Sequence, residues 1–294
     1  MNKIRLSIII VNYNSKELIN NCLTSINKFN DIGDSLEIII VDNSEKMDDY
    51  NWLSNNVRNI TDLKCTVLKN VNNGFGGGNN LGAKHATGDV LLFLNPDTIM
   101  VEPIFNYVIN VLDNNLDIGV LGVQLVDSDG RKNSSYGLRM PLGMIRTLFC
   151  RILIKANVFI QSIMYTSGAD LFIRKNDFFT IGMFDENIFM YCEEADICNR
   201  LNMINKKIYF EKTKHIVHLE GKTQDSDLYT TYLKQMESRK YYCQKYSIDF
   251  VKFVKKEKRY CTLKRLFFEM LNNSTREQEY KRIEKYLDQL VVND

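Results

Sequence analysis

The strongest constraint on the fold is a pair of apolar runs on either side of an amphipathic segment. Residues 6–11 and 36–41 consist of Leu, Ile and Val with one polar residue each. Between them, residues 17–29 place apolar side chains three or four positions apart, which is the spacing of one helix face. Two buried strands joined by a helix predict an α/β fold: a mostly parallel sheet, helices on both faces, and ligands beyond the carboxyl ends of the strands.

Polar residues directly follow three apolar runs. They occupy residues 12–14, 42–44 and 95–97, the last after an apolar run at 90–94. Because parallel strands end at the same edge of a sheet, we expect the three segments to meet in one crevice. Asp42 in this position can accept hydrogen bonds from a ribose or a base, although it would also serve as a helix cap.

The rest of the chain continues as alternating helices and strands. In the core we expect helices at 102–112 and 193–201 and strands at 119–125, 169–173 and 207–210. Beyond residue 222, two or three helices rich in Lys, Arg and Tyr are expected at 228–246, 250–271 and 276–291. We therefore predict a core domain over residues 1–222 and a C-terminal helical extension over residues 223–294.

Composition narrows the class of protein. A chain of 294 residues with 45% apolar residues can bury one large core. Its 38 Lys and Arg against 36 Asp and Glu leave no general basic field for nucleic acid. The seven cysteines form no C-x-x-C pair, which favours a reducing cytoplasm over a disulfide framework. No run reaches about 18 uncharged apolar residues, so we expect a cytoplasmic or peripheral protein.

One segment of the core has a different character. Residues 138–164 mix large apolar side chains with Arg139, Arg146, Arg151 and Lys155. An apolar stretch edged with cations predicts docking on the inner leaflet of the cell membrane. A homodimer interface or a pair of core helices explains the same pattern equally well. The basic residues of 250–268 would add charge, although a solvated helix face is their ordinary explanation.

Glycines dominate residues 72–80, which read Asn-Asn-Gly-Phe-Gly-Gly-Gly-Asn-Asn. Glycine costs backbone entropy, so such a run is expected where the chain approaches something closely. A nest of backbone amides that binds an anion or a base is one interpretation. The spacing does not fit a dinucleotide fingerprint.

A divalent cation site is predicted at Asp97 and His218. Asp97 ends a predicted buried strand, where its oxygens can hold a hard cation that also binds a diphosphate. A turn aspartate after proline is the plainer alternative. His218 lies where the core is expected to end and would bring a nitrogen ligand to the same ion, which favours Mn²⁺ or Mg²⁺.

Three acids begin the predicted helix at 193–201: Glu193, Glu194 and Asp196. Acids are common in a first helical turn because they favour the helix dipole. On a helix Glu193 and Asp196 point one way and Glu194 another, so at most two of them face a crevice. Sugar transfer with inversion needs one carboxylate to take the acceptor proton.

Taken together, five segments resemble the family 2 glycosyltransferases of the GT-A fold, with the closest likeness to bacterial rhamnosyltransferases. They are residues 10–14, 41–44, 72–80, 94–98 and 184–200, in the family's order and spacing. The resemblance covers residues 4–222. It implies an inverting transfer of a sugar, first of all rhamnose from dTDP-rhamnose, to a hydroxyl of a cell-surface polysaccharide such as a capsule or O-antigen, or of a lipid-linked saccharide.

The resemblance also implies roles for individual residues. For the metal site it implies Asp97 and His218, with Asn95 in place of the first acid of the D-x-D signature. It implies Glu194 as the base, with Glu193 as the fallback, and an acceptor site at Asp170 and Glu193. The nucleotide-binding residues that it implies are Val11, Tyr13, Asp42, Gly78, Asn79 and Asn95.

Other functions remain open at this point. A UDP-hexose or UDP-galactofuranose donor is the first alternative. A sugar-1-phosphate nucleotidyltransferase would need a glycine-rich loop with Arg and Lys after its first strand, and residues 12–15 lack one. A noncatalytic sugar-binding scaffold would lose the acids, whereas Asp97 and Glu194 are present together with His218.

Overall fold

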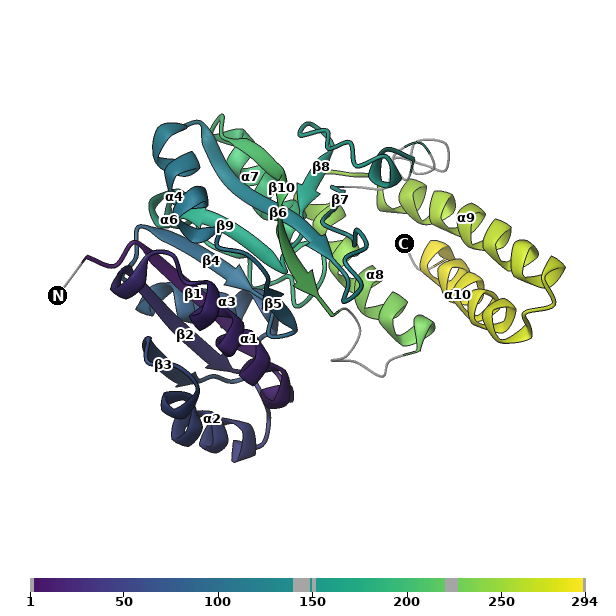
Figure 1. Ribbon diagram of the computed structural model, residues 1–294. Helices are drawn as coiled ribbons and strands as arrows, with labels where there is room; N and C mark the ends of the chain where they lie inside the picture. The colour runs from purple at the N-terminus through teal and green to yellow at the C-terminus, as the bar shows by residue number, and fades with distance from the viewer. Residues whose placement is uncertain (1–2, 140–148, 150–151, 220–226, 293–294) are drawn as a thin grey trace. The chain divides into compact units, whose positions relative to one another are not determined.

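The computed structural model describes residues 3–139, 149, 152–219 and 227–292 (Figure 1). The described residues belong to two compact units, which we call the sheet unit and the helical unit. The sheet unit draws on Met1–Arg139, Phe159–Phe189 and Glu193–Gln224. The helical unit draws on Met140–Val158, Met190–Cys192 and Asp225–Asp294.

The sheet unit is built on an eight-stranded sheet in the order β3-β2-β1-β4-β9-β6-β10-β5. Strand β9 runs antiparallel to its neighbours β4 and β6, and β5 runs antiparallel to β10, while the other pairs are parallel. The predicted mixed, mostly parallel sheet is therefore confirmed. The strands are β1 (Leu6–Asn12), β2 (Leu36–Asp42), β3 (Lys64–Lys69), β4 (Val90–Leu94), β5 (Thr98–Met100), β6 (Ile118–Val126), β9 (Asp170–Arg174) and β10 (Lys207–His218).

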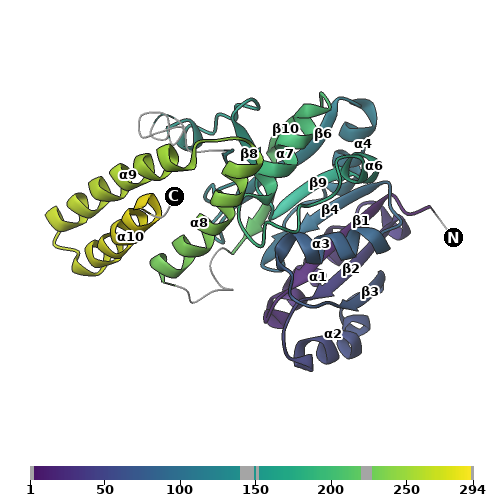
Figure 2. The same cartoon turned by 180° about the vertical axis from the view of Figure 1, so that it is seen from behind.

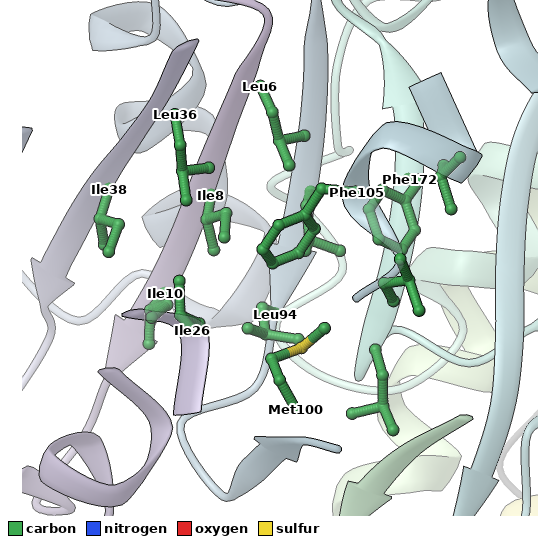
Figure 3. Close-up of a cluster of buried hydrophobic side chains, with 14 of the residues drawn as sticks. Leu6, Ile8, Ile10, Ile26, Leu36, Ile38, Leu94, Met100, Phe105 and Phe172 are labelled. Atoms are coloured by element: carbon green, nitrogen blue, oxygen red, sulfur yellow. The ribbon is translucent and has the colours of Figure 1, made fainter. Parts of the chain in front are cut away.

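Two hydrophobic clusters, one on each face of the sheet, explain the continuous apolar runs. Ile8 and Ile10 of β1 face one cluster, and Ile9 between them faces the other. Figure 3 shows the first cluster, in which Phe105 and Ile26 pack against the sheet. A strand covered on both faces needs apolar residues at every position, because successive side chains point to opposite faces.

Helices supply the other half of each cluster. The first cluster is covered by α1 (Lys16–Phe29), α2 (Met47–Ile60) and α4 (Phe105–Asn114). The second is covered by α3 (Gly74–His85), α6 (Lys175–Thr180) and α7 (Glu193–Met203), and α3 and α7 are seen from this side in Figure 2. Helices on both faces of the sheet were the expectation, and the structure confirms it.

Some elements differ from their predicted extent. Strand β10 runs over twelve residues rather than four, because a register shift between Glu211 and His215 lets it continue along β6. Helix α4 begins at Phe105 instead of residue 102. Neither α2 nor β3 is predicted. Strand β3 was missed because it is a half-exposed edge strand and has no continuous apolar run.

The glycine-rich stretch is the start of a helix, and the close backbone approach expected of its glycines is made to the sheet. Residues 74–85 form α3, which lies against β1 and β2. A Cβ on Gly82 would lie 2.5 Å from the Ile9 side chain, and one on Gly78 would lie 3.0 Å from Val11. The glycines therefore let the helix backbone approach the sheet more closely than larger residues allow.

Part of the predicted membrane-docking segment, residues 140–148 and 150–151, falls outside the described residues. Next to it, β7 (Tyr136–Leu138) and β8 (Met164–Thr166) form a small antiparallel pair. Among the residues that the structure describes, no helix combines the length and the hydrophobicity that a membrane span requires.

The helical unit contains three long helices, α8 (Leu228–Lys245), α9 (Phe250–Met270) and α10 (Ser274–Val292). Helices α9 and α10 lie side by side and antiparallel (Figures 1 and 2). They share a core that includes Phe253, Cys261, Ile283 and Leu287. The aspartates Asp227 and Asp249 cap α8 and α9, each accepting a hydrogen bond from a backbone amide in the first turn.

Candidate active site

The carboxyl ends of β1 and β2 are tied together through Asp42. Its Oδ1 accepts hydrogen bonds from Asn12 Nδ2 at 2.8 Å and from Ser44 Oγ at 2.6 Å. Its Oδ2 lies 2.8 Å from Lys69 Nζ at the end of β3, and Lys69 also donates to the Ser44 carbonyl. The Asp42 side chain is fully buried. We call Asn12, Asp42, Ser44 and Lys69 the strand-end lock.

The strand-end lock was not predicted, although Asp42 was. The register pairs Asp42 with Lys69 on neighbouring parallel strands, so their side chains meet at the sheet edge. Sequence analysis missed Lys69 because it missed β3. A lysine at the end of a short run that contains Val67 and Leu68 is the signal that would have found it. The predicted contact of Asp42 with a nucleotide stays a prediction.

Other residues expected at the nucleotide lie around the same strand ends. Tyr13 directly follows β1 and is 40% exposed, so its ring is available to a ligand. Val11 is half-buried and packs close to the backbone of Gly78. Asn79 is buried, and its Nδ2 donates to the Phe75 carbonyl one turn earlier in α3. Asn79 therefore supports its own helix in this structure.

The structure brings the two predicted metal ligands together. Asp97 Oδ1 and His218 Nε2 lie 3.3 Å apart, with both side chains largely buried. Strand pairing fixes this position, because Thr98 of β5 is the register partner of His218 in β10. The Leu219 amide also donates to the Asp97 carbonyl at 3.0 Å. Residues from distant parts of the sequence thus meet at one edge of the sheet.

These residues fit a divalent cation that takes its remaining ligands from a diphosphate. A carboxylate and an imidazole suit Mn²⁺ or Mg²⁺. Asn95 Nδ2 lies 3.5 Å from His218 Nε2, so the Asn95 amide borders the same pair. Within the described ranges, no three His, Cys, Asp or Glu side chains are grouped as a metal site. The protein alone therefore offers an incomplete ligand set.

The three acids of α7 have different surroundings. Glu194 is half-buried, and its Oε1 accepts a hydrogen bond from the Gly168 amide at 3.1 Å. Glu193 is buried, and its Oε2 has no hydrogen-bond partner among the described residues. Asp196 accepts hydrogen bonds from Arg200 Nε at 2.8 Å and Nη2 at 2.6 Å. This paired geometry assigns Asp196 a structural role, which leaves the two glutamates as candidate bases.

Burial changes the proton affinity of both glutamates. It raises the pKa of Glu193 well above the ordinary value, and the neighbouring Glu194 charge raises it further. Burial also raises the pKa of Glu194, while the Gly168 amide acts in the opposite direction by stabilising the carboxylate. Glu194 is therefore the glutamate that is both more exposed and held by a donor to its charged form.

The backbone just before α7 is held in an uncommon conformation. Tyr191 and Cys192 have φ values of 70° and 75°, in the left-handed region that residues with a Cβ rarely occupy. Neither residue is Gly or Asn, so the sequence carries no sign of this turn. Such conformations cluster at functional sites, where the surrounding structure maintains them.

Asp170 lies inside the sheet. It is fully buried, and its Oδ2 accepts a hydrogen bond from the Val123 amide at 2.6 Å. Its Oδ1 has no partner in the described part of the chain, and burial raises the pKa of the carboxyl well above the ordinary value. The predicted contact of Asp170 with an acceptor sugar stays a prediction, because no oxygen of its carboxyl reaches the surface here.

Comparison with solved structures identifies the fold before any sequence relative is considered. The structure is similar to "Mannosyltransferase PcManGT from Pyrobaculum calidifontis in complex with GDP-Man and Mn2+", with a TM-score of 0.58 and 14% identity. That similarity covers 80% of this chain and 62% of the other. It confirms the GT-A fold that the sequence resemblance implied.

Sequence comparison then identifies the family. Residues 7–184 match the family described as Glycosyl transferase family 2, so this chain belongs to that family. It is 27% identical over 162 residues to "Rhamnosyltransferase WbbL" from Escherichia coli (strain K12), covering 49% of this chain and 60% of the relative. It is 28% identical over 213 residues to "Low-salt glycan biosynthesis hexosyltransferase Agl10" from Haloferax volcanii, covering 69% and 63%. The matches thus span less than two thirds of either relative.

Proposed function

We propose that this protein is an inverting glycosyltransferase that moves a sugar from a nucleotide-diphosphate donor to an acceptor hydroxyl. The observation that carries the proposal is the Asp97–His218 pair at 3.3 Å on the carboxyl edge of the sheet. Membership of family 2 supports the reaction class. A second, less favoured function is a noncatalytic sugar-binding scaffold of the same fold.

In the proposed reaction the acceptor oxygen attacks the anomeric carbon as the bond to the diphosphate oxygen breaks. Glu194 takes the proton from the acceptor hydroxyl. Because the acceptor attacks from the face opposite the leaving diphosphate, the product has the inverted configuration. A divalent cation, when bound, would neutralise charge on the leaving diphosphate. Asp97 and His218 would hold that cation, with the Asn95 amide beside them, while Tyr13 and Val11 would line the nucleotide site together with Asp42, Gly78 and Asn79.

The donor sugar is proposed from the names of the two sequence relatives. We favour dTDP-rhamnose because the relative from Escherichia coli is named a rhamnosyltransferase. A UDP-hexose or UDP-galactofuranose is the alternative, and the relative from Haloferax volcanii is named a hexosyltransferase of glycan biosynthesis. The proposed acceptor is a growing cell-surface polysaccharide or a lipid-linked saccharide, bound near Glu193 and Glu194.

Calorimetric titration tests the donor site directly. Purified protein is titrated with dTDP, UDP and GDP and their sugar conjugates, each with and without Mn²⁺ or Mg²⁺. We expect one nucleotide to bind and its affinity to depend on the cation. Asp97→Asn should remove the dependence on the cation, whereas the matched change Asp89→Asn, at a half-exposed surface ion pair with Lys3, should keep it. Absence of nucleotide binding would refute the proposal.

Product analysis separates the enzyme from the scaffold. NMR of the glycoside formed from the bound donor should show inverted anomeric configuration. A product with retained configuration would contradict the single displacement. Tight binding of a nucleotide sugar without turnover of any offered acceptor would favour the scaffold.

A further inference from the structure

Helix α9 carries one continuous exposed stripe whose two halves differ in chemistry. Apart from the adjacent pair Leu266 and Phe267, its residues follow one another at intervals of three or four positions, which places them on one face of the helix. The N-terminal half is cationic and the C-terminal half is apolar. We call this set the α9 stripe: Lys252, Lys255, Arg259, Leu263, Leu266, Phe267 and Met270.

The apolar half of the α9 stripe is more exposed than side chains of this kind usually are. Leu263 is 48% exposed, Phe267 is 50% exposed and Met270 is 82% exposed. Leu271, which directly follows the helix, is 59% exposed. Scattered exposed apolar residues are ordinary, but a row of them on one helix face indicates a binding surface.

The core of the helical unit does not use this face. Phe253, Val254 and Cys261 of α9 are buried among the other helices. Towards α10, Arg265 Nε lies 2.9 Å from Glu284 Oε2, and Lys258 pairs with Asp288. The inward face of α9 is therefore occupied, whereas the α9 stripe is exposed among the residues that the structure describes.

The charge of the α9 stripe is unbalanced. Lys252, Lys255 and Arg259 have no ion-pair partner among the described residues, while the nearby cations Lys258 and Arg265 do. Three unpaired cations in line with an exposed apolar row call for a partner that offers anions beside an apolar phase. The headgroup region of an anionic bilayer combines the two.

We propose that the α9 stripe docks the protein on an anionic membrane surface. The apolar half enters the boundary between headgroups and acyl chains, and the cationic half contacts lipid phosphates. A second copy of the chain fits less well. Parallel stripes would set cation against cation, and antiparallel stripes would set cations against apolar side chains, so neither supplies an anion. This inference goes beyond the proposed transferase activity and does not depend on it.

Co-sedimentation of the full chain with vesicles tests this surface. We expect binding to vesicles of phosphatidylcholine mixed with phosphatidylglycerol, and little binding to phosphatidylcholine alone. Replacement of Lys252, Lys255 and Arg259 by Gln should weaken binding on the order of a hundredfold, at about fivefold for each cation near the surface. The matched control replaces Lys28, Lys84 and Lys132, three exposed lysines of the sheet unit, by Gln and should bind as the unchanged protein does.

The apolar half is tested separately. Replacement of Leu266, Phe267 and Met270 by Ser should remove the binding that persists at high salt, because salt screens only the charged contacts. Leu116→Ser with Met203→Ser is the control, since both are exposed apolar residues of the sheet unit. Thermal unfolding of each variant checks that the fold is kept, as expected for side chains that face away from the core.

Three results would overturn the proposal. The first is equal binding of both stripe variants and the unchanged protein to the mixed vesicles. The second is equal binding to the two kinds of vesicle, which would leave the cations without a role. The third is light scattering that shows a dimer which the stripe variants dissociate, in the absence of vesicle binding, because a second copy would then be the occupant.

Discussion

Two parts of the same sheet edge differ in whether all oxygens of their buried carboxylates have hydrogen-bond partners. At the ends of β1, β2 and β3, both oxygens of the buried Asp42 accept hydrogen bonds from within the protein. Around β9 and α7, Asp170 Oδ1 and Glu193 Oε2 are buried without a partner among the described residues. A satisfied network rigidifies a fold, whereas unmet polar groups and raised pKa values mark places where chemistry is expected. The comparison teaches that the first part holds the strands, whereas the second, within the described chain, leaves polar groups unmet beside Glu194, the proposed base.

Removal of the carboxylate from the strand-end lock should have the largest effect. Asp42→Ala leaves Asn12 and Ser44 without their acceptor and Lys69 without its counter-ion. We expect a loss of about 3–5 kcal/mol in the free energy of unfolding, the range for breaking a buried pair. Urea unfolding measures it. Asp89→Ala, which removes a half-exposed partner of Lys3, should cost less than about 1 kcal/mol.

A different result for Asp42→Ala would assign the buried carboxylate to the ligand instead of the fold. If Asp42→Ala keeps its stability but loses nucleotide binding, then Asp42 serves the ligand and the strand-end lock does not hold the strands. Calorimetry with the preferred nucleotide on the same protein sample distinguishes the two.

The largest effect on turnover is expected at Glu194. Glu194→Gln keeps the size and the hydrogen bond from Gly168 but removes the base, so turnover should fall by about 10² or more. Donor affinity should be unchanged in the same variant. Steady-state assays and calorimetry give the two numbers.

Glu193→Gln is the matched variant one residue earlier. Because Glu193 is buried and both burial and the neighbouring charge raise its pKa, we expect it to be a poorer base than Glu194 and Glu193→Gln to be nearly silent in turnover. Loss of turnover in Glu193→Gln together with normal turnover in Glu194→Gln would transfer the role of base to Glu193.

Sequence reasoning located most of the fold because the strands of a sheet covered on both faces appear as continuous apolar runs in the sequence. The strands at 6–11, 36–41 and 90–94 are found within one residue of their observed ends. It missed β3 because an edge strand is half-exposed and lacks such a run. It did not predict α3 because glycine has a low helix propensity, and close packing on the sheet outweighs that propensity.

The candidate site was predictable only in part. Asp97 and His218 were expected to meet, and the β5–β10 register brings them to 3.3 Å. Lys69 could not be found without β3. The burial of Asp170 could not be read from the sequence either, because only the register of β9 between β4 and β6 decides which side chains face inward.

Asp170 offers a pH test of the part of the sheet edge whose polar groups are unmet among the described residues. Burial raises its pKa in the folded state, so the folded protein binds a proton that the unfolded chain has released. Its contribution to stability is therefore complete below the unfolded Asp pKa of about 3.9 and is lost as pH rises through the folded pKa, by up to about 1.4 kcal/mol per pH unit.

Asp170→Asn should abolish this pH dependence. The variant keeps an oxygen for the Val123 amide and cannot ionise, so it should gain stability relative to the unchanged protein as pH rises. Urea unfolding of both proteins at a series of pH values measures the difference. A constant difference at all pH values would show that Asp170 titrates normally and that its burial has no electrostatic cost.

The smallest effect is expected where the signature acid is missing. Asn95 stands beside the Asp97–His218 pair, with its Nδ2 at 3.5 Å from His218 Nε2. Asn95→Asp would add a second carboxylate to a site that has one, and we expect it to tighten Mn²⁺ binding in the presence of nucleotide by roughly threefold to tenfold, about 1 kcal/mol. Asn114→Asp, on the exposed end of α4, controls for the added charge. Unchanged Mn²⁺ affinity in Asn95→Asp would mean that this position does not face the cation, and the metal site would then rest on Asp97, His218 and the diphosphate alone.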